Sequence, residues 1–329
     1  MDIIISHKSA LEYWRLNRNT EITALSKQRR KSLPHSLPSS ATIIDASPSG
    51  LSYPINIMVS NKNAKRKSRI LRTRINTSTV PDGCFTGIGD GLAVSSPAFC
   101  FFQMAGELPL VKLIELGFEI CGTYSLPVMS DHSSGFRHDH ENTDENIHAL
   151  YGLPQLTSIK ALKAFTARMK GMNGYKKACR ALHYIANGSA SPMETKLFML
   201  LTLPHEQGGY ELPAPVLNRH IDLSNSTDWR LRKSGYRCDL FWPDANLAIE
   251  YDSDTYHTGA DRIARDSKRR FDLLMLGITV ITITSRQLRN AVEFDGLATL
   301  IAGKLRKRLR YKNPQQFLKA KRELRGLLL

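Results

Sequence analysis

Three carboxylates interrupt an otherwise apolar stretch of the sequence, YRCDLFWPDANLAIEYDS (236–253). Asp239 lies in its first half, and Glu250 and Asp252 lie in its second half. Carboxylate oxygens are the ligands that hard ions such as Mg²⁺ or Mn²⁺ prefer. A metal ion held by such residues can polarise a phosphate ester and activate water, so the stretch points to metal-assisted phosphodiester cleavage.

The same stretch predicts two strands joined by a turn at Pro243–Asn246. Such a turn pairs Trp242 with Leu247, and three residues back along each strand it puts Asp239 opposite Glu250. The period of two places the third acid on the same face. Like charges so placed destabilise a strand pair, and a bound cation would relieve this. A register slip by one residue would move the first acid to the other face, and a solvent-exposed acidic face would need no cation.

The distribution of positive charge indicates a polyanionic partner. The 329-residue chain has a formal net charge of +16. Segment 62–74 has seven Lys or Arg residues and no acid, and segment 301–329 has ten with a single acid. A charge run can be only a solvated face, but two dense runs favour nucleic-acid binding. In the first run we expect contacts from Lys65, Arg66 and Lys67.

Composition excludes several classes of protein. No apolar run approaches the roughly 20 residues of a membrane span, and the first residues, MDIIISHKSALEYWR, lack the pattern of a secretory signal. The five cysteines form no C-x-x-C pair, which argues against a disulfide framework or a structural zinc site. We therefore expect a cytoplasmic protein with no membrane partner.

Turn signals and periodicity divide the chain into three parts. Residues 1–50 predict an N-terminal helix and a polar linker. Residues 51–187 predict an α+β domain, with short strands up to about residue 94 and helices after it. Residues 188–329 predict a second domain whose elements follow the order α-β-β-β-α-β from Ser191, with basic helices at the end. The fold class is α/β (α+β) with a mixed sheet.

Several motifs occur in order within the second domain: SPMETKLFMLL, YRCDLFWPDANLAIEYDSDTYH and RDSKRRFDLLMLGITVITIT. Over about residues 188–305 they resemble the PD-(D/E)XK nucleases, and more closely the restriction-endonuclease-like branch related to very-short-patch-repair endonucleases. Upstream, SSPAFCFFQMA and the helices after it are similar to AbiEi-type antitoxins of abortive-infection systems. The resemblance implies a restriction-endonuclease-like αβββαβ core, preceded by a smaller regulatory or DNA-binding domain.

The resemblance also implies roles for individual residues. Asp239 and Glu250 match the metal-binding acids, and Glu194 matches the helix acid that completes such sites. Asp252 stands where the name-giving lysine of the superfamily would be, which is a departure from its pattern. His257 matches a histidine of this branch that could shuttle a proton or contact the leaving group.

Some of these positions have a second interpretation. Ser191 and Glu194 have the spacing of a capping box, in which the acid is only a cap partner. His257 could be an exposed loop residue. Either Lys196 or Lys268 could replace the missing lysine.

The helix expected after the acidic strand is basic on one face. Nucleic-acid contacts are expected from Lys196, Arg262, Arg265, Lys268 and Arg269, while Asp266 is expected to pair with arginines of its own helix. The chain is thus predicted to be an Mg²⁺-dependent (or Mn²⁺-dependent) DNA endonuclease or nickase in a defence or toxin–antitoxin setting. The missing lysine keeps open an inactive nuclease fold that binds DNA as a transcriptional regulator. RNA as the substrate, a homodimer and a toxin partner also stay open.

Overall fold

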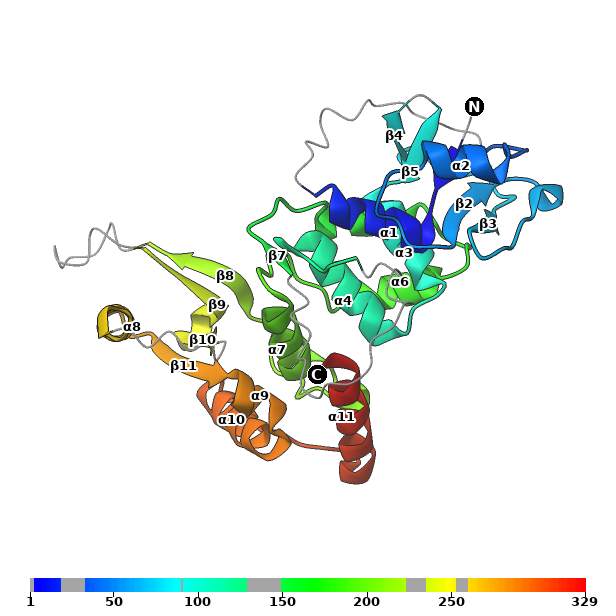
Figure 1. Ribbon diagram of the computed structural model, residues 1–329. Helices are drawn as coiled ribbons and strands as arrows, with labels where there is room; N and C mark the ends of the chain where they lie inside the picture. Colours follow the sequence, from blue (N-terminus) through cyan, green and yellow to red (C-terminus); the bar gives the residue numbers. More distant parts are fainter. Residues whose placement is uncertain (1–2, 19–32, 90, 129–148, 223–234, 253–259) are drawn as a thin grey trace, which may run out of the picture. The chain divides into compact units, whose positions relative to one another are not determined.

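The computed structural model describes residues 3–18, 33–89, 91–128, 149–222, 235–252 and 260–329, without the side chains at 260–263 and 265–266. The chain forms two compact units, Met1–Ile185 and Ala186–Leu329 (Figure 1). Both units combine helices with a sheet of mixed strand directions, so the expected α+β class is confirmed.

The first unit is built on a five-stranded sheet in the order β3-β2-β1-β5-β4. Its strands are β1 (Ile3–Ile5), β2 (Ile55–Val59), β3 (Leu71–Ile75), β4 (Phe85–Gly89) and β5 (Leu92–Ser95). Strand β1, which the sequence did not predict, lies in the middle of the sheet, antiparallel to β2 and parallel to β5. The N-terminal residues therefore belong to the core of this unit, where Ile4 and Ile5 are fully buried.

Helices of the first unit follow the capping and proline signals of the sequence. They are α1 (His7–Leu16), α2 (Ser40–Ala46), α3 (Pro97–Ala105), α4 (Leu110–Cys121), α5 (Ile159–Ala167) and α6 (Tyr175–Ala181), with a short hairpin of β6 (Tyr124–Ser125) and β7 (Leu150–Tyr151). Ser96 caps α3 by accepting a hydrogen bond from the Phe99 N–H, and Pro97 occupies the first turn of the helix. The helical stretch from Pro97 to Cys121 forms two helices, α3 and α4, and Pro109 is the N-cap of α4.

The second unit has a four-stranded sheet in the order β11-β10-β9-β8. Its strands are β8 (Val216–Ile221), β9 (Tyr236–Trp242), β10 (Leu247–Asp252) and β11 (Thr279–Thr284). Strands β8, β9 and β10 pair antiparallel, whereas β11 pairs parallel to β10. A parallel pair requires a crossover connection, and helix α8 (Ala260–Met275) provides it.

The helices of the second unit complete the expected order α-β-β-β-α-β and extend it. They are α7 (Pro192–Thr202), α8, α9 (Ser285–Arg289), α10 (Ala291–Lys304) and α11 (Pro314–Leu328), with the 3-10 turns η2 (His205–Gln207) and η3 (Pro243–Ala245). Helix α8 packs on one face of the sheet, where its Leu273 is buried with Phe241 and Ala248. Within the described part of the chain, no helix has the length and apolar character of a membrane span.

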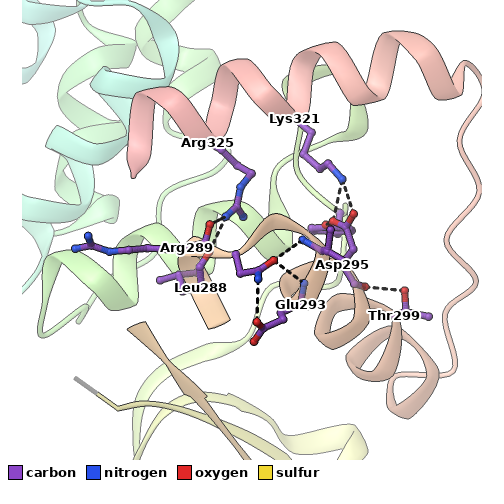
Figure 2. A network of polar contacts seen from close by, with 10 residues as sticks. Leu288, Arg289, Glu293, Asp295, Thr299, Lys321 and Arg325 are labelled. Carbon is purple, nitrogen blue, oxygen red and sulfur yellow. Dashed lines mark hydrogen bonds and ion pairs between the residues drawn. The ribbon is translucent and has the colours of Figure 1, made fainter. Parts of the chain in front are cut away.

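Ion pairs and hydrogen bonds hold the C-terminal helix α11 against α9 and α10 (Figure 2). The Lys321 ammonium donates to both carboxylate oxygens of Asp295, at 2.8 and 2.7 Å. The Arg325 guanidinium donates to the carbonyl oxygens of Leu288 and Arg289, each at 2.7 Å. Because these carbonyls lie in the last turn of α9, the cation also faces the negative end of that helix.

Candidate functional site

Strands β9 and β10 pair in the register that the sequence predicts. Trp242 lies opposite Leu247 across the turn, and the pairing continues through Phe241 opposite Ala248 to Leu240 opposite Ile249. Asp239 and Glu250 are the next residues of the two strands, and the Asp239 carboxylate binds the Tyr251 N–H of β10. Phe241 and Ala248 lie two residues from these acids along their strands and therefore on the same face. They pack with Leu273 of α8, so this is the face that the helix covers.

The predicted acids meet in a small polar hollow of about 190 Å³. It lies between the hairpin β9–β10, the neighbouring strand β11 and helix α8. Its lining residues are Asp239, Glu250, Tyr251, Asp252, Arg269, Arg270 and Thr282. The structure thus brings three of the five expected catalytic residues together, next to two arginines.

Asp239 is half-buried and is bound by the backbone of β10. Its Oδ2 accepts a hydrogen bond from the Tyr251 N–H at 2.9 Å. Burial raises the pKa of Asp239 above its usual range, while that hydrogen bond and the charges of Arg269 and Arg237 act in the opposite direction. The carboxylate is therefore held in place, but its charge is incompletely compensated.

Glu250 forms an ion pair with Arg269 of α8. The same guanidinium donates to the Arg237 carbonyl oxygen at 2.5 Å and lies over the Tyr236 ring, 5.7 Å from its centroid. Arg269 was expected to contact nucleic acid, and the structure places it on the acidic site itself. The sequence contained a signal for this position, because Arg269 lies four residues before the buried Leu273 and so shares the inward face of the helix.

Asp252 lies at the end of β10 and is exposed. It lines the hollow and stands opposite Thr284 in the parallel pairing with β11. His257, for which we expected a role in proton transfer, lies outside the described residues. Arg270 also lines the hollow and is exposed, although the sequence did not single it out.

Glu194 occupies a separate position on α7 and is 7% exposed. Its Oε2 accepts hydrogen bonds from the Ala190 N–H at 2.9 Å and from the Asn218 side-chain amide at 2.6 Å. The Ser191 hydroxyl in turn accepts from the Glu194 N–H at 3.1 Å. This is a variant of the expected capping box, because the acid reaches the residue before the N-cap and also ties α7 to β8. Burial raises the pKa of Glu194, and the negative charge of Asp239 adds to that shift.

The basic residues expected to bind nucleic acid have different surroundings. Lys268 of α8 is exposed, as are Lys65 and Lys67 of the first unit. Arg66 instead donates to the carbonyl oxygens of Pro38 and Leu37, at 2.5 and 3.1 Å, and so binds the segment that precedes α2.

The remaining residues of that prediction lie on α7 and in the first turns of α8. Lys196 is half-buried on α7, next to the capping network. The side chains of Arg262 and Arg265, and that of Asp266 with its expected pairing, lie outside the description.

The acids of the hollow fit a metal ion only as a small set of ligands. Among the described residues, no group of three or more His, Cys, Asp or Glu side chains is placed to hold one. Mg²⁺ commonly takes only one or two carboxylates and completes its shell with water and substrate phosphate. Asp239 and Glu250 fit this smaller donor set, provided that Arg269 releases the Glu250 carboxylate.

Comparisons with known proteins leave the family open. No family model matches the chain, and no solved structure matches it. Two curated proteins of Mycobacterium tuberculosis are similar: uncharacterized protein MT2308 of strain CDC 1551 / Oshkosh and uncharacterized protein Rv2248 of strain ATCC 25618 / H37Rv. Each is 28% identical over 123 residues, which is 37% of this chain and 41% of the relative. The chain thus spans about two fifths of each relative, and the nuclease and antitoxin resemblances stay predictions.

The Asp239→Asn variant should gain stability relative to the wild type as the pH rises from acid to neutral. Because burial raises the pKa of Asp239, the folded protein binds this proton more tightly than the unfolded chain does. Ionisation therefore costs the wild type stability as pH rises from about 4, the usual aspartate range, through the folded pKa. Asp239→Asn keeps an acceptor for the Tyr251 N–H and does not ionise. Urea unfolding at pH 4 and pH 7 should show the advantage of the variant growing with pH, and a pH-independent difference would contradict this assignment.

For Glu194 we expect the amide and alanine variants to differ in stability. Glu194→Gln keeps an oxygen that can accept from Ala190 and Asn218, so unfolding should change little. Glu194→Ala leaves both donors unpaired and should cost about 1–3 kcal/mol. Urea unfolding of the two variants and of Asn218→Ala checks this. Equal losses in Gln and Ala would show that the negative charge, and not the hydrogen bonding, stabilises this end of α7.

Proposed function

We propose that the second unit hydrolyses phosphodiester bonds of DNA in an Mg²⁺-dependent reaction, as an endonuclease or nickase of the cytoplasm. The observation that carries the proposal is the polar hollow in which Asp239, Glu250 and Asp252 meet beside Arg269 and Arg270. Carboxylates and arginines at one site suit a phosphate ester, because acids can hold a divalent ion and arginines can hold phosphate oxygens.

In this proposal each residue of the hollow has its own task. Asp239 and Glu250 would hold the ion, which when bound would polarise the scissile phosphate and lower the pKa of water. Asp239 is oriented by the Tyr251 N–H and needs little movement to act. Arg270, exposed at the rim, and Lys268 on the same helix would hold the flanking phosphates of the strand. Arg269 would exchange its contact with Glu250 for a phosphate oxygen.

A second function is favoured by one observation, the ion pair between Arg269 and Glu250. If this pair persists, the site stays neutralised by the chain's own cation and holds no metal. The unit would then be a nuclease fold that binds DNA without cutting it, for example as a transcriptional regulator. Asp252 in place of the expected lysine is compatible with this alternative.

Plasmid cleavage tests the catalytic proposal. Supercoiled DNA incubated with the full chain should be nicked or cut with Mg²⁺ or Mn²⁺ and stay intact with EDTA. Asp239→Asn and Glu250→Gln should each lower the rate about a hundredfold or more, because loss of a ligand charge removes several kcal/mol of transition-state stabilisation. Asp244→Ala is a matched control, since this acid of the same hairpin is exposed in the turn. Activity in Asp239→Asn equal to that of the control would contradict the site.

An Arg269→Gln variant separates the two functions. If the unit cleaves DNA, the variant should need about tenfold less Mg²⁺ for half-maximal cleavage. The reason is that the positive charge of Arg269, which competes with Mg²⁺ for the Glu250 carboxylate, is removed. If the unit only binds DNA, neither wild type nor variant cleaves at any Mg²⁺ concentration, and the variant binds DNA more weakly. Titrations of cleavage and of fluorescence anisotropy against Mg²⁺ measure both outcomes.

A further inference from the structure

A second hollow of the same unit lies between turn η2 and the start of α11, away from the acidic site in sequence. Its volume is about 370 Å³, at the lower end of the roughly 300–1,000 Å³ of small-ligand sites. The residues that line it are Pro204, His205, Glu206, Glu211, Arg310, Tyr311, Lys312, Asn313, Gln316 and Phe317. Aromatic, basic and acidic side chains thus meet in one place.

Three aromatic rings form one wall of this hollow. Tyr311 and Phe317 stack with centroids 4.1 Å apart and an interplanar angle of 13°. The His205 ring meets both, at 4.7 Å from Tyr311 and 5.4 Å from Phe317. Phe317 is buried, whereas Tyr311 is half-exposed. The exposed part of the Tyr311 ring is therefore available to a planar ligand, while Phe317 supports the ring from one face.

The wall is fixed from several sides. Asn313 caps α11 by accepting from the Gln316 N–H at 3.0 Å. One turn beyond Phe317, the Lys321 ammonium binds Asp295 (Figure 2) and lies 5.6 Å from the Phe317 ring centroid. On the opposite side, the Lys307 ammonium donates to the Glu211 carbonyl oxygen. The rings are thus positioned before any ligand arrives.

The polar groups of the hollow match a nucleotide better than a simple anion. Arg310 and Lys312 flank Tyr311 on the exposed side, in a segment, 304–312, with six Lys or Arg residues and no acid. They suit the phosphates of a strand. Glu206 and Glu211 offer acceptors for the amino groups of a base, which an anion site would not need.

Turn η2 also contains polar groups that the protein leaves unsatisfied. The buried Nε2 of His205 and both amide atoms of Gln207 have no hydrogen-bond partner within the described part of the chain. Buried polar atoms without partners cost stability, so a ligand group that reaches one of them gains a favourable contact.

We propose that this hollow binds one unstacked base of a single-stranded nucleic acid, with the base on Tyr311 and its phosphates on Arg310 and Lys312. The inference rests on the nucleic-acid part of the proposed function and not on cleavage. Single strands are favoured over duplex DNA because stacking on a side chain requires a base that has left its own stack. The site would hold a strand end or an opened nucleotide while the basic segment binds the strand on either side.

Fluorescence of 2-aminopurine tests the site directly, in EDTA so that no cleavage occurs. A single strand of about 15 nucleotides with one central 2-aminopurine should be quenched on binding to the full chain. Tyr311→Leu should bind about tenfold more weakly and lose the quenching, since one stacked base is removed. Tyr311→Phe keeps the ring and should behave as the wild type. Melting temperatures of both variants verify that α11 is still in place.

A ligand-side control does not depend on the folding of any variant. The same strand with abasic sites keeps every phosphate but has no base to stack on Tyr311. It should therefore bind to the wild type about tenfold more weakly than the intact strand does. Equal affinity for the abasic strand, or competition by polyglutamate as effective as by the intact strand, would show that charge alone acts here and would overturn the inference. Quenching without plasmid cleavage leaves this site standing and removes the nuclease proposal, whereas cleavage without quenching does the reverse.

Discussion

The fold of the second unit must stabilise neighbouring carboxylates in a largely buried hairpin. Asp239 of β9 and Glu250 of β10 line the same hollow, and ionised carboxylates brought together in this way repel each other and lose hydration. The Tyr251 N–H binds Asp239, the Arg269 guanidinium binds Glu250, and the charges of Arg269 and Arg237 also favour the ionised Asp239. Burial nevertheless raises the pKa of Asp239, so the loss of hydration outweighs these contacts at that residue.

Helix α8 joins this electrostatic requirement to the fold. The parallel pair β10–β11 can form only if the chain crosses over between the strands, and α8 is that crossover. Its buried Leu273 packs against Phe241 and Ala248, and the same face presents Arg269 to Glu250. The packing of α8 on the sheet therefore also brings Arg269 to Glu250. A substrate phosphate or a metal ion acting at this site would have to compete with a contact that the fold itself supplies.

The end of the chain combines anchoring and exposure in a similar way. Helix α11 is tied to α9 and α10 through Lys321 and Arg325, two cations of a strongly basic segment. The basic residues that precede the helix, such as Arg310 and Lys312, remain exposed beside the aromatic wall. Some basic residues of this segment therefore bind carboxylates and carbonyls of their own unit, and others stay exposed to solvent.

Much of the second unit could be predicted from local sequence. Strands β8, β9 and β10, the register of Trp242 with Leu247, and the convergence of Asp239 with Glu250 and Asp252 were expected from alternation and turn signals. These features depend on neighbours within a few residues or across one tight turn, so the sequence contains their causes. The order of elements after Ser191 belongs to the same class.

Other features depend on which distant segments meet, and these only the tertiary structure decided. Strand β1 completes a sheet with partners about 50 and 90 residues away, and three isoleucines alone do not reveal such pairing. The Glu194 carboxylate binds Asn218 across 24 residues, and His205 meets Tyr311 across more than a hundred. Residue types and spacing thus determined which side chains could do chemistry. Long-range packing determined which cation lies on Glu250 and which rings line the second hollow, because those contacts exist only once the strands and helices have come together.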